Sequence, residues 1–334
     1  MKIQTDVNLK PYNSFGISQS AAHFAEVENL EDLKQALSYG EEHFLSVHIL
    51  GQGSNTLFIQ DYPGLLIHMA CLGIERFEDS GIVKAACGEN WHQFVEYCLK
   101  NNLHGIENLA LIPGTIGAAP IQNIGAYGVE LEQLVLGVEV FNRETATVEV
   151  LSREQCEFSY RDSIFKSGAK NKYVVLSLAL QLNASPVVHT DYAALKQQLT
   201  GVEEPGPRDV FEAVCSIRQT KLPDPSALGN AGSFFKNPLI SQDKFSSLSS
   251  EYPDIPCFDS GEEGLLKVPA AWFIEKAGWK GRRKGDAGVH EQHALVLVNY
   301  GEASGEDILL LAQDISNSVL QSFGIALQPE VNFV

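Results

Sequence analysis

The chain has 334 residues, more than one typical hydrophobic core supports, so two or three domains of about 100–150 residues each are expected. Its 24 basic and 42 acidic residues give a formal net charge of −18. This charge argues against general affinity for nucleic acid or for an anionic membrane surface. A negatively charged small ligand would therefore need a local cluster of basic side chains.

No apolar run in the sequence reaches the ~20 residues needed to span a bilayer, and the N-terminal segment lacks the apolar core of a signal peptide. We therefore expect a cytoplasmic protein. The six cysteines form no C-x-x-C pair, and the two closely spaced histidines, His290 and His293, have no third ligand nearby in the sequence. We expect buried, reduced thiols and no metal site.

The first third of the chain alternates between strand-like and helix-like segments, as in a mixed α and β domain. Residues 29–43 predict a helix, because Asn29 can cap its first turn and leucines recur behind it at helical spacing. Strands are predicted over residues 21–27, 46–50, 64–70 and 82–87, and a second helix over residues 91–103.

Residues 105–130 interrupt this pattern, because repeated glycines and two prolines break an apolar background. Buried irregular backbone must find hydrogen-bond partners, and a large polar ligand is one source of them. Upstream, the sequence GQGSN at residues 51–55 follows a predicted strand and could turn its N–H groups and the Ser54 hydroxyl toward a diphosphate.

GQGSN is not the dinucleotide fingerprint G-x-G-x-x-G, since Thr56 stands in place of the third glycine. A plain turn remains an alternative interpretation of this short motif. Two glycine-rich segments in one domain could, however, hold the two ends of an extended dinucleotide.

The remaining elements become more helical toward the C-terminus. A hairpin is predicted from residues 136–142 and 145–151, and the character of the sequence shifts near residues 183–191, where we place the main domain boundary. Further strands are predicted over residues 173–182, 293–299 and 327–334, and helices over residues 208–222, 269–279 and 305–324.

The stretch GNAGSFFKNP (229–238) presents Ser233 on a run of small residues that we expect to form a flexible bend. A nucleophilic serine needs a base, yet the chain has no G-x-S-x-G elbow and no evident Ser–His–Asp set. A serine hydroxyl can instead act as a general acid toward a carbanion or enol formed beside it. Arg161 could stabilise the oxyanion and Glu330 could manage the proton. The simpler interpretation of Arg161 is an ion pair with Asp162 or another acid. The simpler interpretation of Glu330 is a solvated strand residue.

Arg218, Lys221 and Lys236, together with Tyr192, are the nearest approach to a basic cluster in this acidic chain. Arg218 and Lys221 are three residues apart on one predicted helix and therefore share a face. A bound phosphate is one interpretation, and a helix C-terminus that attracts cations is the other.

These segments closely resemble one family, the UDP-N-acetylenolpyruvoylglucosamine reductases of bacterial peptidoglycan synthesis. The resemblance covers almost the whole chain in the family's order, and its most specific parts are residues 107–130 and 229–238. The other segments that carry it are residues 9–17, 50–55, 88–95, 158–166, 218–225 and 327–333.

The resemblance implies an α+β protein with an FAD-binding unit of the PCMH type, as in vanillyl-alcohol-oxidase-like flavoproteins, and a C-terminal α+β substrate-binding domain. A tyrosine loop near Tyr192 resembles the type I branch of the family, in which a tyrosine closes over the substrate. The implied boundaries are 1–70 and 71–186 for two FAD-binding subdomains (PCMH-type region 17–185), 187–326 for the substrate domain and 327–334 for a C-terminal strand carrying Glu330.

The resemblance also implies a reaction, the NADPH-dependent, FAD-mediated reduction of UDP-N-acetylglucosamine enolpyruvate to UDP-N-acetylmuramate. A hydride would pass from flavin N5 to C3 and a proton from Ser233 to C2, with Arg161 and Glu330 stabilising the enolate. Non-covalent FAD would contact Gly51, Gly53, Ser54, Asn55, Ile112, Pro113, Gly114, Ala118, Ile121 and Gly125. Substrate contacts are implied at Tyr127, Tyr192, Arg218, Lys221, Asn237 and His293.

Two positions depart from the family pattern: His293 stands where relatives often carry glutamine, and Asn332 where a basic residue is common. We expect a monomer with small-molecule partners only, and no nucleic acid, membrane or metal. A flavin oxidase on the same scaffold is the alternative activity, although no His or Cys lies in residues 51–55 or 113–128 to tether a flavin. A non-catalytic FAD-binding module is a further alternative.

Overall fold

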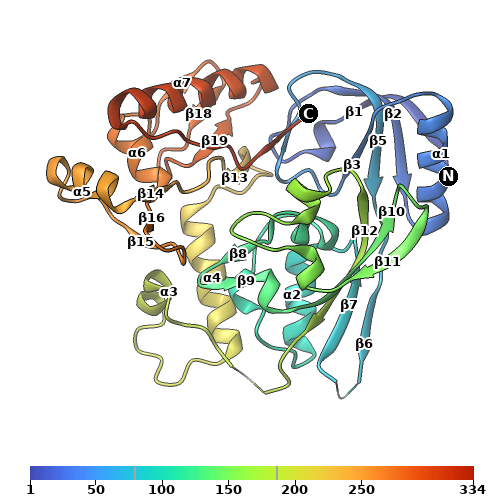
Figure 1. Cartoon of the computed structure of the whole chain (residues 1–334), viewed down its shortest axis with the longest axis horizontal. Coiled ribbons are helices and arrows are strands. Elements are labelled where there is room, and N and C mark those ends of the chain that lie inside the picture. Colours follow the sequence, from blue (N-terminus) through green and yellow to red (C-terminus); the bar gives the residue numbers. More distant parts are fainter. Residues whose placement is uncertain (79, 186) are drawn as a thin grey trace. The chain divides into compact units, whose positions relative to one another are not determined.

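The computed structural model describes residues 1–78, 80–185 and 187–334, and the chain divides into two compact units (Figure 1). The first unit comprises Met1–Val7, Ala21–Gly53 and Pro63–Thr220, and the second comprises Asn8–Ser20, Ser54–Tyr62 and Lys221–Val334. Each unit is thus assembled from segments distant in sequence. The boundary predicted at residue 186 lies outside the described residues, and those at 70 and 326 stay predictions.

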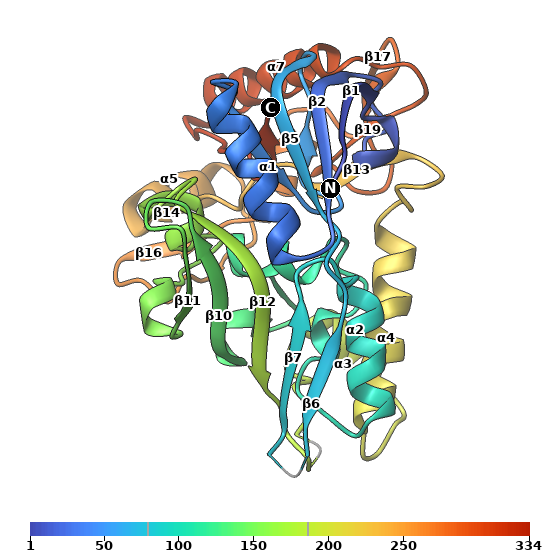
Figure 2. The ribbon, with the colours of Figure 1, turned by 90° about the vertical axis from the view of Figure 1, so that its right-hand side faces the viewer.

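A four-stranded sheet and one helix form the first layer pair of the first unit. The strand order is β1 (Ile3–Asn8), β2 (Ser20–Val27), β5 (Tyr62–Met69) and β3 (Val47–Leu50). Helix α1 (Leu30–Glu42) packs its buried leucines against β2 and β5 (Figure 2). Asn29 caps α1 as predicted, because its Oδ1 accepts a hydrogen bond from Asp32 N at 3.0 Å.

The second sheet of the first unit is five-stranded and antiparallel. Its strand order is β11 (Thr147–Leu151), β10 (Val135–Asn142), β12 (Tyr173–Gln181), β7 (Ile82–Ala86) and β6 (Ile74–Phe77). Helix α2 (Trp91–Lys100) buries Trp91, Phe94 and Val95 in the same core as the inward side chains of this sheet. The predicted β10–β11 hairpin is confirmed.

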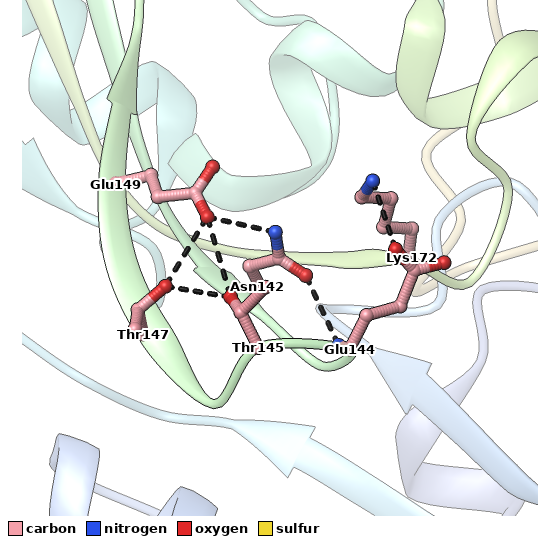
Figure 3. Close-up of polar contacts among 6 residues, drawn as sticks. All are labelled: Asn142, Glu144, Thr145, Thr147, Glu149 and Lys172. Atoms are coloured by element: carbon pink, nitrogen blue, oxygen red, sulfur yellow. Dashed lines mark hydrogen bonds and ion pairs between the residues drawn. The ribbon is translucent and has the colours of Figure 1, made fainter.

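A polar network closes the turn of that hairpin (Figure 3). Glu149 Oε1 accepts hydrogen bonds from Asn142 Nδ2 at 2.7 Å and from Thr147 Oγ1 at 3.2 Å, and Lys172 pairs with Glu144 at 2.9 Å. Asn142 is buried, so its amide would be costly to leave without a partner. The network therefore helps to fix the hairpin register, in which Asn142 faces Thr147.

Residues 105–130 form neither a linker nor a regular element, as predicted. They run through the interior of the first unit as short pieces, with many side chains fully buried. The pieces are the 3-10 helices η2 (Glu107–Leu109) and η3 (Ile116–Gln122) and the two-residue strands β8 (Gly125–Ala126) and β9 (Val129–Glu130). Two helices follow later, α3 (Ala193–Gln198) and α4 (Pro207–Lys221), of which α4 runs from the first unit into the second.

The second unit is built around helix α7 (Gly305–Phe323), whose apolar face packs on β18 and β19 (Figure 1). A capping box between Ser304 and Asp307 begins this helix. The main sheet has the order β13 (Gly229–Ser233), β19 (Val296–Asn299), β18 (Ala287–Val289) and β17 (Arg283–Lys284). The other elements are α5 (Gln242–Glu251), α6 (Ala270–Lys276), the small sheet of β14 (Leu239–Ser241), β16 (Leu265–Lys267) and β15 (Phe258–Asp259), and the parallel pair of β4 (Thr56–Leu57) and β20 (Asn332–Phe333).

The prediction of a flexible bend at residues 229–238 is wrong, because Gly229–Ser233 form β13 and pair antiparallel with β19. A register irregularity lies between Asn230 and Ser233, and Gly232 has φ +68° within it. A Cβ at Gly229 would lie 2.2 Å from Phe15 O, so only glycine fits at the start of this strand.

Two other predictions need correction. The strand predicted over residues 327–334 is limited to β20 and a single bridge between Pro329 and Phe235. The cysteines are not all buried, since Cys257 is exposed and Cys71 and Cys215 are only partly covered. Within the described residues, no helix combines the length and apolar character that a membrane span requires.

Candidate functional site

The two glycine-rich segments of the first unit lie together. Gly114 N donates a hydrogen bond to Gln52 Oε1 at 3.1 Å, and a Cβ at Gly51 would lie 2.6 Å from Thr115 Oγ1. Gly53 has φ +65° and Gly114 φ +123°, a backbone region that glycine occupies without strain. The segments therefore form one cradle of backbone, which we call the glycine cradle (residues 51–53 and 113–118).

The glycine cradle suits an extended dinucleotide such as FAD. The Thr115 hydroxyl is buried, and it has no hydrogen-bond partner among the residues that the structure describes. Buried hydroxyls are normally paired, so an additional polar group is needed to complete this one. A Cβ at Gly51 would also lie 3.8 Å from Ala118 Cβ, so the two segments approach this closely because residue 51 has no side chain.

The other predicted cofactor residues are distributed over both units. In the first unit, Ile112 and Ile121 pack against the core, and the carbonyl oxygens of Ile121 and Gly125 accept hydrogen bonds from Ser163 Oγ and from Arg161. In the second unit, Ser54 O accepts a hydrogen bond from Ser14 Oγ at 3.2 Å, and Asn55 Nδ2 donates to Glu330 O. Pro113 is exposed at the edge of the cradle.

Arg161 lies at a tight turn of the first unit. Ser159 and Asp162 exchange two backbone hydrogen bonds of 3.1 Å across the turn, and Arg161 has φ +56°, which is uncommon for a residue with a side chain. Its guanidinium donates a hydrogen bond to Gly125 O at 3.1 Å. A strained, anchored arginine is typical of a functional position, where the surrounding structure maintains the strain.

Tyr127, Tyr192 and Arg218 gather near Arg161 in the first unit. The rings of Tyr127 and Tyr192 meet edge to face, with centroids 5.3 Å apart. The Tyr127 hydroxyl lies within hydrogen-bonding reach of Arg218, whose Nε also donates to Leu111 O at 3.2 Å. Two guanidinium groups and two phenols thus supply the local positive and hydrogen-bonding cluster that an anionic ligand of this acidic chain would need.

The titration of this cluster follows from burial. Burial raises the pKa of the Tyr127 phenol, an effect that the nearby Arg218 partly offsets. Burial also lowers the pKa of the Arg218 guanidinium. Tyr127 partly offsets this effect, and the like charge of Arg161 lowers the pKa of Arg218 further. An incoming anion would relieve the repulsion between the two arginines.

Ser233 and Glu330 lie on neighbouring segments of the second unit. Phe234, the residue after Ser233, accepts a hydrogen bond through its carbonyl oxygen from Glu330 N at 2.8 Å. Asn55 Nδ2 donates to Glu330 O at 3.1 Å on the other side. Glu330 is only 9% exposed, so the interpretation of a solvated strand residue is wrong.

Asn237 and Asn332 both make structural contacts in the second unit. Asn237 Oδ1 accepts a hydrogen bond from Ala270 N at 3.0 Å at the start of α6, so its amide Nδ2 is the group that can face a ligand. Asn332 Nδ2 donates to Asn55 O at 3.3 Å, and the backbone N of Asn332 donates to the same oxygen. At position 332 the side chain thus supports the loop that follows the glycine cradle.

His293 lies among basic groups of the second unit. Its Nδ1 accepts a hydrogen bond from Leu295 N at 3.4 Å, which leaves the proton of the neutral ring on Nε2. An Nε2–H group can donate to a phosphate oxygen, as a glutamine amide can. Burial lowers the pKa of His293, and Lys221, His290 and Lys280 lower it further.

Sequence reasoning missed several of these residues. Gln52 and Thr115 lie within the two glycine-rich motifs. Nothing in the spacing of the motifs showed that Gln52 would contact the segment of Gly114, or that Thr115 would contact Gly51. Lys280 and His290 join Lys221 and His293 near one point of the second unit. The basic run at residues 280–284, close to the HEQH sequence, was the available signal.

Comparisons with known proteins match the whole chain. A family described as "UDP-N-acetylenolpyruvoylglucosamine reductase, C-terminal domain" matches residues 224–334, and one described as "FAD binding domain" matches residues 21–152. The UDP-N-acetylenolpyruvoylglucosamine reductase of Pseudomonas fluorescens (strain Pf0-1) is 44% identical over 337 residues, which cover 99% of this chain and 99% of that protein.

Two solved structures share the fold. The UDP-N-acetylenolpyruvylglucosamine reductase of Thermus caldophilus aligns with a TM-score of 0.71 at 24% identity, covering 100% of this chain and 99% of the other. A 6-hydroxy-D-nicotine oxidase from Arthrobacter nicotinovorans aligns with a TM-score of 0.54 at 10% identity, covering 97% and 86%. With the matched FAD-binding family, they confirm the predicted α+β fold, in which a PCMH-type, vanillyl-alcohol-oxidase-like FAD-binding unit precedes a C-terminal domain.

We predict that Thr115→Val weakens FAD binding about tenfold, the loss expected when one hydrogen bond is removed from a buried site. Thr115→Ser keeps the hydroxyl and should bind FAD nearly as well as the wild-type protein. Flavin fluorescence during titration of the apoprotein measures both affinities. Equal affinity of the valine and serine variants would show that the Thr115 hydroxyl does not contact the cofactor.

Proposed function

Because the chain belongs to the UDP-N-acetylenolpyruvoylglucosamine reductase family, we propose that it catalyses the NADPH-dependent reduction of UDP-N-acetylglucosamine enolpyruvate to UDP-N-acetylmuramate. The family makes the chain an oxidoreductase of peptidoglycan precursor synthesis that contains an FAD-binding domain. The observation that carries the proposed mechanism is the placement of Glu330 beside Phe234, directly after Ser233.

The chemistry that FAD supplies when bound is hydride transfer, from NADPH to C3 of the enolpyruvyl group. The glycine cradle would hold the cofactor through Gly51, Gly53, Gly114 and the Thr115 hydroxyl. Addition of hydride at C3 leaves an enolate, with negative charge on the substrate carboxylate and an unprotonated C2.

Ser233 Oγ then donates its proton to C2, which completes the reduction, and the serine recovers a proton from solvent afterwards. A neutral hydroxyl is a weak acid, so its proton leaves readily only where the site favours the charge that develops. The guanidinium of Arg161 would stabilise the enolate, and the carboxyl of Glu330 would assist its protonation. The rigid backbone position of Glu330 supports this assignment, because a group that handles one proton must be positioned before the reaction.

The sugar nucleotide carries a diphosphate, an anion that basic and hydrogen-bonding side chains can bind. In the first unit, Tyr127, Tyr192 and Arg218 would contact the substrate, as their mutual contacts support. In the second unit, Lys221, the Asn237 amide and His293 Nε2–H are the proposed donors. The predicted flavin oxidase alternative receives support from fold likeness alone.

We predict that Ser233→Ala separates the two half-reactions. NADPH should reduce the bound flavin at a near-normal rate, because no proton from Ser233 is needed there. Turnover of the enolpyruvate substrate should fall by roughly 10²–10³, the cost of losing one group that acts only in the transition state. Stopped-flow absorbance of the flavin measures both steps.

The control for this prediction is Ser250→Ala, which removes an exposed hydroxyl on α5 that donates only to Ser246 O. This variant should retain both rates. Unchanged turnover in Ser233→Ala would exclude Ser233 as the proton donor.

We predict that diphosphate binding is linked to protonation of His293. Burial and neighbouring cations lower the pKa of His293 in the free protein, and an anion beside the ring raises it. Binding therefore takes up a proton between these two pKa values, and affinity decreases as pH rises through this window. Calorimetry of UDP binding in two buffers of different ionisation enthalpy should show this uptake, and His293→Gln should abolish it. Equal proton uptake by the glutamine variant would contradict the assignment.

A further inference from the structure

Asn108 lies in η2 and is only 1% exposed. Its side-chain amide donates two hydrogen bonds to main-chain carbonyls, to Tyr127 O at 2.9 Å and to His189 O at 2.8 Å. One amide group thus uses both of its hydrogens. The two carbonyls belong to segments 62 residues apart in sequence, each of which carries one of the paired tyrosines.

Both acceptors lie where the backbone needs support. Tyr127 has φ +49° in the turn between β8 and β9, a conformation that costs free energy for a residue with a side chain. His189 precedes Tyr192, the N-cap residue of α3, by three positions. In the described part of the chain, the bond from Asn108 is the one hydrogen bond that reaches residues 187–191 from outside that segment.

We propose that Asn108 is a positioning residue, which holds the segment of Tyr192 against the turn of Tyr127 and thereby sets the affinity for the sugar nucleotide. This inference rests on the proposed function, in which both tyrosines contact the substrate. Asn108 itself contacts neither substrate nor reacting atoms, and it acts through the main chain of residues 127 and 189.

The chemistry of asparagine matches this position. Two carbonyl oxygens must be satisfied at once, and a primary amide offers two donors in a fixed plane. Serine offers one donor and alanine none. Without Asn108, the segment at 187–191 loses its anchor, and the edge-to-face contact of the tyrosine rings at 5.3 Å no longer has a fixed geometry.

Kinetics of Asn108→Ala, Tyr192→Ala and the double variant test the inference. In Asn108→Ala, KM for UDP-N-acetylglucosamine enolpyruvate should rise about tenfold, within the range of couplings between contacting residues. The value of kcat should change by no more than about twofold, because positioning affects binding rather than proton transfer. In the Tyr192→Ala background, removal of Asn108 should raise KM no further.

Hydrogen exchange provides a readout that needs no substrate. In the FAD-bound enzyme, the backbone amides of residues 188–195 should exchange faster in Asn108→Ala than in the wild-type protein. Asn13→Ala is the matched control, because Asn13 is a buried asparagine of the second unit that likewise donates to two carbonyls, Leu9 O at 2.7 Å and Ile17 O at 3.0 Å. It should leave the exchange of residues 188–195 unchanged.

Two results would overturn the inference. One is a KM of the double variant that equals the product of the separate increases caused by Asn108→Ala and Tyr192→Ala. The other is hydrogen exchange at residues 188–195 that Asn108→Ala leaves unchanged. Should Asn108→Ala not fold, Asn108→Ser, which keeps one donor, is tested by the same two measurements against the same expectations. A wild-type protein that does not turn over the enolpyruvate substrate would contradict the proposed function instead. Hydrogen exchange would then still decide whether Asn108 holds the segment.

Discussion

Two hydrogen bonds to the backbone of Glu330 hold this residue between two other segments of the second unit. Glu330 N donates to Phe234 O at 2.8 Å, and Glu330 O accepts from Asn55 Nδ2 at 3.1 Å. The backbone of residue 330 is thereby fixed beside Phe234, which follows Ser233, and neither bond depends on the ionisation of the carboxylate. Because Phe234 N donates to Leu295 O at 2.8 Å, the same strand is also held from its far side. The proposed proton chemistry depends on this fixed backbone position of residue 330.

In the first unit, hydrogen bonds from side chains hold an irregular stretch of backbone in place. Its segment at residues 105–130 is buried but irregular, so side chains satisfy some of the carbonyl groups that no regular element pairs. Arg161 bonds to Gly125 O and Asn108 to Tyr127 O, and each also supports a residue proposed to bind substrate or cofactor. The side chains that complete the fold here are therefore among those that prepare the site.

Local patterns in the sequence predicted the regular elements well. Helix α1 followed from its Asn29 cap and leucine spacing, and the β10–β11 hairpin from its alternation. Strand β13 was missed because its small residues carry no hydrophobic alternation, and its partner β19 lies more than 60 residues away. Helix α5 was missed because its serine-rich sequence has low helix propensity. The N-cap at Ser241 was the main sequence signal for this helix.

The sequence predicted which residues belong to the candidate site. It did not predict how those residues are arranged. Ser233, Arg161 and Glu330 could be named from motifs, but the positive φ of Arg161 and the burial of Glu330 arise from contacts that no local pattern encodes. Asn108 shows the same limit, since its role depends on His189, 81 residues further along the chain.

The central claim is that this chain carries reducing equivalents from NADPH, through bound FAD, to the enolpyruvyl group. An anaerobic experiment tests it most directly: one equivalent of NADPH bleaches the yellow flavin, and UDP-N-acetylglucosamine enolpyruvate is then added. The account predicts that the yellow colour returns with this substrate and not with UDP-N-acetylglucosamine, which lacks the enolpyruvyl group. A flavin that stays bleached with the enolpyruvate substrate and regains its colour only when air is admitted would contradict the account.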